Sequence, residues 1–293
     1  MHYTKFISAF ILIFVYKSQV VAALPSLYFK PGRIELKADS EYFWTTSNYD
    51  TSGTSQSLPD SNSYKNVTTK LDGLMYTQAN WALGGGVGFA YAESVAAVDT
   101  RTNNQLTDVH LRVQKPISKD FLGSDNFFLL PEAEALFFLS KIDKNSTSDD
   151  VLTGEGANEL KIGTWVAYRI RSFFVYGFIG YNNRDDDRSA LLPWRVGINW
   201  QKTRFYFSGE IGGYKSISDD SYVNQRFERI NVTSIRDAGS FRYYSVNPSL
   251  IEARIEVAFR ISNSLGIYGG YSKTISGEST ADGQSILAGL TYN

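Results

Sequence analysis

The chain has 293 residues, with 29 Lys and Arg against 30 Asp and Glu, two His and no Cys. The absence of cysteine excludes disulfides, thiolate metal sites and cysteine nucleophiles. The near balance of charge argues against nucleic-acid binding, which needs a concentrated basic surface.

Residues 1–23 have the features of an export signal. A short basic region ends at Lys5, an apolar run covers residues 6–16, and Val21, Ala22 and Ala23 supply a small-residue cleavage site. The apolar run is shorter than the ~20 residues that a membrane-spanning helix needs, and no later segment is long and apolar enough either. We therefore expect residues 1–23 to be removed and residues 24–293 to form one domain.

Apolar and polar residues alternate in twelve later stretches, as they do on the two faces of a β-strand. In the clearest one, 250–261, the odd-numbered residues are apolar, whereas the even-numbered ones include Glu252, Arg254, Glu256 and Arg260. Each stretch is close to the ~9–11 residues with which a tilted strand crosses a bilayer. The predicted strands are 33–44, 67–78, 81–91, 106–114, 127–139, 159–170, 172–181, 191–200, 203–214, 250–261, 264–272 and 284–292.

The connections between these strands alternate in length. Those after odd-numbered strands are long (45–66, 92–105, 140–158, 182–190, 215–249 and 273–283), and those after even-numbered strands are short, except for 115–126. This alternation is typical of a transmembrane barrel with long outer loops, short periplasmic turns and both termini in the periplasm. The sequence thus predicts an all-β fold, a single antiparallel up-and-down barrel of about 12 strands.

The segment 215–249 is the least regular part of this scheme. As a strand, residues 222–232 would place Arg226 or Arg229 toward lipid, at a cost of ~2–4 kcal/mol at the bilayer midplane. We interpret 215–249 as a large extracellular loop, with or without a hairpin of its own. A barrel of about 14 strands, also an even number, is the alternative.

The complete pattern resembles the porin-like class of bacterial outer-membrane β-barrel proteins. The last strand alternates apolar residues (Ile286, Ala288, Leu290) and ends on the aromatic Tyr292, although Asn293 follows it. No motif selects a family within the class. The resemblance implies the bacterial outer membrane as location, with outer-membrane lipids, lipopolysaccharide and the barrel-assembly machinery as partners.

Three motifs suggest chemistry, and each also has a structural interpretation. His110 lacks the closely following serine of outer-membrane hydrolases. Glu132 and Glu134 match a glycosidase carboxylate pair, but they are predicted to face Arg112 and either Lys161 or Arg169 in an ion-pair network. The oxygen-rich stretch 182–188 lacks the ligand order of a calcium loop. We therefore expect no enzyme, no metal site and no cofactor.

Alternate residues of the third strand are small and lie on its inward face. Gly84, Gly86 and Gly88 leave this part of the lumen wall almost bare, which gives either space for solute or room for a bulky element. The residues predicted to line the lumen are Glu35, Lys37, Asp39, Lys70, Asp72, Gly84, Gly86, Gly88, His110, Arg112, Glu132, Glu134, Lys161, Arg169, Arg195, Glu210, Glu252, Arg254 and Glu256.

Barrels of 8 strands can fill their interior with side chains, and those of 16–18 leave a channel. Twelve lies between, and we expect a narrow passive channel for small polar solutes. The loop 215–249 would fold inward as a constriction and supply Arg226, Arg229, Arg236 and Arg242. The alternatives are a non-conducting structural or surface-interaction barrel and, third, an outer-membrane hydrolase.

Overall fold

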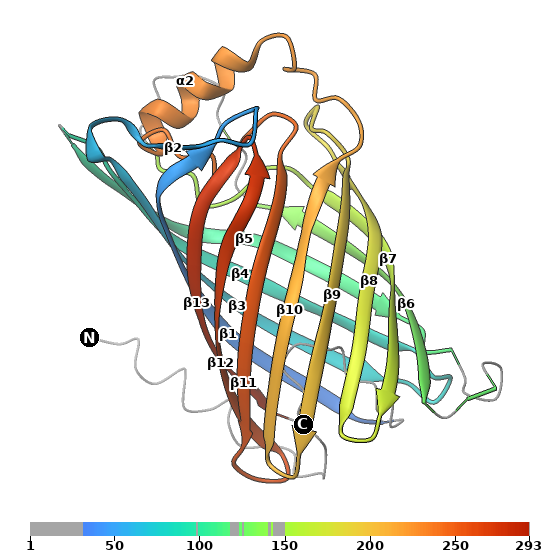
Figure 1. Ribbon diagram of the computed structural model, residues 1–293. Helices are drawn as coiled ribbons and strands as arrows, with labels where there is room; N and C mark the ends of the chain where they lie inside the picture. The colour runs from blue at the N-terminus through green and yellow to red at the C-terminus, as the bar shows by residue number, and fades with distance from the viewer. Residues whose placement is uncertain are drawn as a thin grey trace.

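The computed structural model describes residues 32–97, 99–117, 123–124, 126–139, 142 and 150–292. The predicted signal 1–23 lies outside this part of the chain. Twelve long antiparallel strands pair in chain order, and β13 pairs with β1, which closes the barrel (Figure 1). They are β1 (Ile34–Tyr49), β3 (Ser63–Tyr76), β4 (Ala82–Val95), β5 (Thr100–Gln114), β6 (Phe127–Phe138), β7 (Glu159–Ile170), β8 (Phe173–Arg184), β9 (Leu191–Lys202), β10 (Phe205–Ser216), β11 (Ser249–Arg260), β12 (Leu265–Glu278) and β13 (Thr280–Tyr292).

The 12-strand prediction is confirmed, and the alternative of 14 strands is wrong. The three-residue β2 (Ser55–Ser57) pairs only with the end of β1, and η1 (Pro59–Ser61) follows it. The ambiguous stretch forms α2 (Arg226–Arg236), neither a strand nor a hairpin, which lies across one end of the barrel (Figure 1). Within the described residues, no helix is long and apolar enough to cross a membrane.

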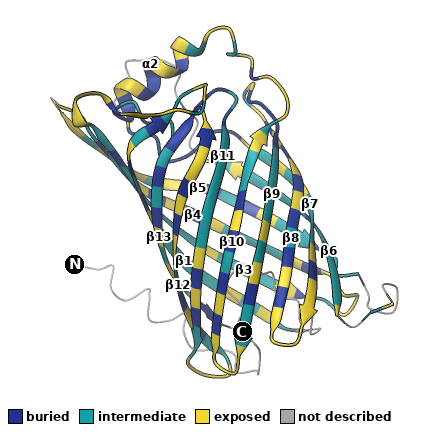
Figure 2. Cartoon of the chain, in the orientation of Figure 1, coloured by how far each residue is buried: buried dark blue, intermediate teal, exposed yellow. Residues whose placement is uncertain are grey.

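The outer surface of the barrel is apolar around its whole circumference. Exposed and less exposed residues alternate along the strands (Figure 2), as the pleat requires. Every strand of the barrel contributes at least one exposed large apolar side chain to this surface. One from each is Leu36, Leu71, Val87, Leu111, Phe137, Ile162, Ile179, Val196, Ile211, Ile255, Ile267 and Ile286.

Long connections gather at one end of the barrel and short turns at the other, as predicted. The turn between β9 and β10 contains only residues 203–204, and that between β7 and β8 only residues 171–172. At the opposite end, β10 and β11 are joined through α2 and the coils on either side of it (Figure 1). We call these the short-turn end and the long-loop end.

Several strands extend further toward the long-loop end than predicted. The expected loop 273–283 is almost entirely strand, because β12 and β13 are separated by Ser279 alone. Bulges explain the error: Thr46, Thr107 and Ile275 are each an extra residue in the pairing of their strands. Beyond an extra residue, the side chains that faced lipid face the lumen and the reverse. The apolar–polar alternation of the sequence is therefore interrupted at each bulge, and a strand predicted from this alternation ends there.

Candidate functional site

The barrel encloses a polar cavity of about 570 Å³. It reaches from Glu35, near the short-turn end of β1, to Arg242 and Tyr243, which belong to the segment between β10 and β11. The predicted lumen residues that line it are Glu35, Lys37, Asp39, Lys70, Asp72, His110, Arg112, Glu132, Glu134, Lys161, Arg195 and Arg254. Gly84 lines an adjoining cavity of about 100 Å³ that shares Glu35 and Arg112 with the larger one.

Of the other predicted residues, three glutamates are paired with arginines that line this cavity, whereas Arg169 is exposed and does not line it. Glu252 and Glu256 pair with Arg254 at 3.3 and 3.7 Å, and Glu210 pairs with Arg195 at 3.2 Å. Arg169 is at the short-turn end of β7, where its Nε donates to the carbonyl of Arg171. Glu41, Asp108, Glu155 and Tyr243 also line the cavity, although they were not among the predicted lumen residues, and so does Arg242, which was predicted at the constriction. Glu41 and Asp108 could have been found, because they occupy the alternate positions of β1 and β5 that face the lumen. Glu155, Arg242 and Tyr243 lie in loops, where no alternation identifies them.

A chain of charge pairs crosses the wall formed by β5, β6 and β7. The register places Arg112 opposite Glu134, and Glu134 opposite Lys161. Arg112 Nε lies 2.7 Å from Glu134 Oε2, and Lys161 Nζ lies 3.1 Å from Glu134 Oε1. One carboxylate therefore serves two cations, as the ion-pair interpretation of the glutamates required, and the Glu132 carboxylate accepts a 2.9 Å hydrogen bond from Gln114.

His110 lies between two carboxylates. Its Nε2 is 2.6 Å from Asp72 Oδ1 and its Nδ1 is 3.8 Å from Asp108 Oδ1. The bulge at Thr107 directs two consecutive side chains inward, and the Thr107 hydroxyl donates to Asp108 at 2.6 Å. These contacts fix the imidazole ring against the wall.

The glycine face of β4 is covered by side chains of β5. A Cβ atom built on Gly86 would lie 2.7 Å from His110 Cε1, and one on Gly88 would lie 2.7 Å from Thr107 Oγ1. Such distances leave no space for a side chain. Of the two alternatives for this face, the structure supports room for bulky neighbouring groups, with no open space for solute at Gly86 or Gly88.

Tyrosines occupy the lumen along β8, β10 and β12. Tyr206 and Tyr268 are buried in one cluster with Ala258, and Tyr206 is also hydrogen-bonded to Asn199. The Tyr176 hydroxyl donates to Glu210 at 3.1 Å. The polar cavity is consequently confined to part of the barrel cross-section.

The long-loop end is covered by two chain segments, 150–157 and 217–248, which together we call the plug. They are held to each other: Leu152 N–H donates to Asp237 at 2.9 Å, and Arg236 Nε donates to the carbonyl of Asp150 at 2.5 Å. They are also held to the barrel, because the Tyr64 hydroxyl of β3 donates to the carbonyl of Leu152 at 2.6 Å. Burial raises the pKa of Asp237 well above its usual range, although the Leu152 N–H opposes the shift.

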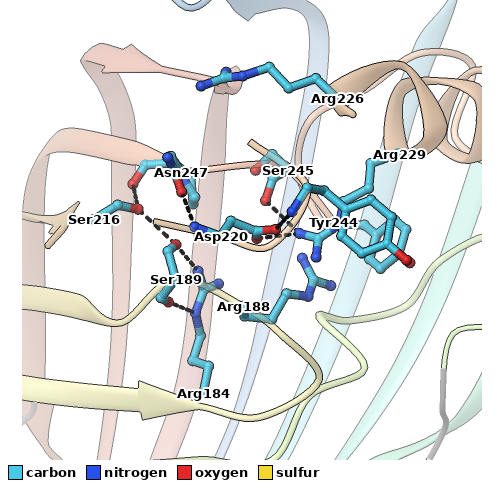
Figure 3. A network of polar contacts seen from close by, with 12 residues as sticks. Arg184, Arg188, Ser189, Ser216, Asp220, Arg226, Arg229, Tyr244, Ser245 and Asn247 are labelled. Carbon is cyan, nitrogen blue, oxygen red and sulfur yellow. Dashed lines mark hydrogen bonds and ion pairs between the residues drawn. The ribbon is translucent and has the colours of Figure 1, made fainter. Parts of the chain in front are cut away.

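Arginines stack on an aromatic ring where the plug meets the loop between β8 and β9 (Figure 3). The guanidinium carbons of Arg188 and Arg229 lie 4.3 and 4.8 Å from the centre of the Tyr244 ring. Arg188 also pairs with Glu155 at 3.4 Å. Arg184 donates to the Ser189 hydroxyl at 2.8 Å within that loop and pairs with Glu155 of the plug at 3.8 Å, which keeps the loop against the plug.

The four arginines expected at a constriction have different positions. Arg242 lines the central cavity, 3.7 Å from Glu41 and with its guanidinium carbon 3.9 Å from the centre of the Phe43 ring. Arg229 and Arg236 are buried inside the plug and stabilise it. Arg226 donates to the Ser279 hydroxyl at 3.3 Å, at the rim. The plug therefore contributes Arg242 to the lumen.

No family model and no curated protein matches this sequence. Among solved structures, an outer membrane channel from Pseudomonas putida F1 is similar, with a TM-score of 0.70 and 10% identity over 92% of this chain and 99% of that chain. The NanC porin has a TM-score of 0.49 and 11% identity over 88% and 99%. The KdgM porin has a TM-score of 0.47 and 8% identity over 88% of this chain and 98% of that chain. At such an identity the likeness concerns the fold: this chain shares a closed antiparallel β-barrel with the Pseudomonas putida channel, and its outer surface is apolar.

Proposed function

We propose that this outer-membrane barrel is a narrow passive channel for small polar solutes. The observation that carries the proposal is the charged cavity, which continues along the lumen from Glu35 near the short-turn end to Arg242 in the plug. In a barrel whose interior is packed with side chains, we would expect apolar or closely packed residues along this wall in place of a charged cavity. Charged side chains facing a cavity of this size favour hydrated contents.

The channel is narrow because two structures reduce its cross-section. Tyr176, Tyr206 and Tyr268 fill the side formed by β8, β10 and β12. At the long-loop end, Arg242 and Tyr243 of the plug extend to the cavity and form its outer boundary. Passage past the plug is thus the expected rate-limiting step.

Conductance of the purified protein in planar bilayers tests the proposal. The wild-type barrel should give small unitary steps, and loosening the plug by Arg229→Met should increase their size, since Arg229 is buried within it. Glu228→Gln, an exposed change on the same helix, should leave the steps unchanged. A folded barrel that is silent in both the wild-type and Arg229→Met forms would contradict the channel.

A non-conducting barrel is the second candidate. The ion pairs around Glu134 and Arg254 favour it, because these pairs along the lumen wall and the tyrosine cluster together reduce the free cross-section. The conductance measurement separates this candidate from a channel.

We further propose that the protein has no hydrolase activity, since His110 is held between Asp72 and Asp108. Release of fatty acids from phospholipid vesicles by the purified protein would contradict this. We propose outer-membrane lipids, lipopolysaccharide and the barrel-assembly machinery as its partners, because the apolar outer surface needs a lipid environment and a route into it.

A further inference from the structure

We infer that the channel prefers small anions over cations, an inference that rests on the proposed channel function. Formal charge alone does not predict it. Among the described residues that line the cavity, eight are carboxylates and seven are Lys or Arg, with His110 in addition. The preference comes from which member of each ion pair faces the water-filled space.

In four ion pairs of the lumen, the cation is the more exposed partner. The Arg195 side chain is 42% exposed, whereas its partner Glu210 is 5% exposed. Arg112 and Lys161 are 34% and 29% exposed, and Glu134 between them is 13% exposed. In the same way, Lys37 is 33% exposed and its partner Asp39 is 14% exposed.

The carboxylates that are better exposed than their partners do not reverse this order. Glu155 and Asp72 are both 21% exposed, Glu252 beside Arg254 is 22% exposed and Glu35 is 18% exposed, all less than any of the four cations above. Near the plug, Arg242 and Glu41 are almost equally exposed, at 28% and 26%. The most accessible charged groups of these lumen pairs are therefore positive.

This asymmetry has a geometric cause and an electrostatic consequence. The short carboxylate side chains lie close to the barrel wall, and the longer Lys and Arg side chains pair with them from the lumen side. A permeating ion meets the positive groups first, and low-dielectric walls focus their field into the pore. Charged side chains lining a pore select ions of the opposite sign.

The zero-current potential of the channel in a KCl gradient tests the inference. Its sign should indicate a preference for chloride over potassium. Arg195→Gln should shift it toward potassium, because the buried Glu210 then lacks its partner, and Arg195→Lys should restore most of the chloride preference. Raising the salt concentration should weaken the preference, since the screening length falls from about 10 Å at 0.1 M to about 3 Å at 1 M.

A matched control is available on the outer wall. Lys65 pairs with Glu93 at 2.7 Å and lies on the same face of β3 as the outward Leu71, so Lys65→Gln removes one positive charge without changing the lumen. It should leave the zero-current potential unchanged. A potassium-selective wild-type channel, or an effect of Lys65→Gln equal to that of Arg195→Gln, would overturn the inference while the channel function stands. A folded barrel with no conductance would overturn both.

Discussion

Arg229 of α2 and Asp220 form an ion pair of 2.5 Å in which both side chains are almost wholly buried, at 2% and 0% exposed. The guanidinium is enclosed further by the rings of Tyr222 and Tyr244, whose centres lie 4.6 and 4.8 Å away. Two charges removed from water in this way depend on each other, because either one alone would remain buried without compensation. The pair therefore joins α2 to the start of the plug.

Removing one partner of this pair should loosen the plug without unfolding the barrel. We expect Arg229→Met to destabilise the plug by about 3–5 kcal/mol, the usual cost of an unpaired buried charge. Limited proteolysis of the reconstituted protein should then cut within 217–248 much faster than in the wild type. Glu228→Gln provides the control on the same helix, and equal cleavage of Arg229→Met and wild type would show that the pair does not hold the plug.

The strands were predictable because each one meets two different environments. Lipid on one side and lumen on the other impose a period of two, which the residues on either side of Val257 follow without interruption. The strand ends were not predictable, since bulges at Thr46 and Ile275 shift the alternation and since the wall beyond the bilayer needs no apolar face. The helix α2 was missed because this stretch was compared only with the two-residue period of a strand. Its buried residues Arg229, Val232, Thr233 and Arg236 recur at the three- to four-residue spacing of a helix.

The charge pairs of the lumen were partly predictable and the plug contacts were not. Arg112, Glu134 and Lys161 are neighbours through strand register, which the order of the strands determines. Arg242 and Tyr243 reach the cavity through packing between segments far apart in the chain, such as that of Tyr243 against Tyr64. No local pattern in the sequence specifies such contacts.

The plug should become less stable as the pH rises. In the folded plug, burial raises the pKa of Asp237 well above its usual range, and the nearby Arg236 only partly opposes this. When the plug opens, the pKa returns to about 3.9. Between these two values the closed plug holds a proton that the open plug lacks, so its stability falls by up to about 1.4 kcal/mol per pH unit.

Protease susceptibility of the plug measured against pH checks this expectation. Cleavage should increase with pH in the wild type, and Asp237→Asn should flatten the profile because the amide does not titrate. Asp219→Asn removes an exposed carboxylate from the same segment and serves as the control. A profile that is unchanged by Asp237→Asn would assign the pH dependence to another group.

A charge on the outer face should prevent membrane assembly, whereas a charge on the inner face should be tolerated. Val257 is 51% exposed on the lipid side, and Val257→Arg places a cation in hydrocarbon at a cost of about 2–4 kcal/mol at the midplane. Gln114 faces the lumen and donates to Glu132, so Gln114→Arg gains an opposite charge as its neighbour. The yield of folded barrel in outer-membrane fractions measures the difference, and equal yields would mean that the two faces are exchanged.

Filling the glycine face of β4 should strain the barrel and not merely narrow it. A Cβ added to Gly86 would overlap the carbonyl oxygen of Leu71 and would lie 2.7 Å from His110 Cε1. We expect Gly86→Ala to cost about 1–3 kcal/mol, the usual range for overpacking, and Gly86→Trp to lower the yield of folded barrel. Gly209→Ala on β10 is the matched control, because its Cβ has no atom within 4 Å. Denaturant unfolding in detergent measures the stabilities of the two alanine variants. If Gly86→Trp instead assembles normally and lowers the conductance, the glycine face is open to solute and His110 does not occupy it.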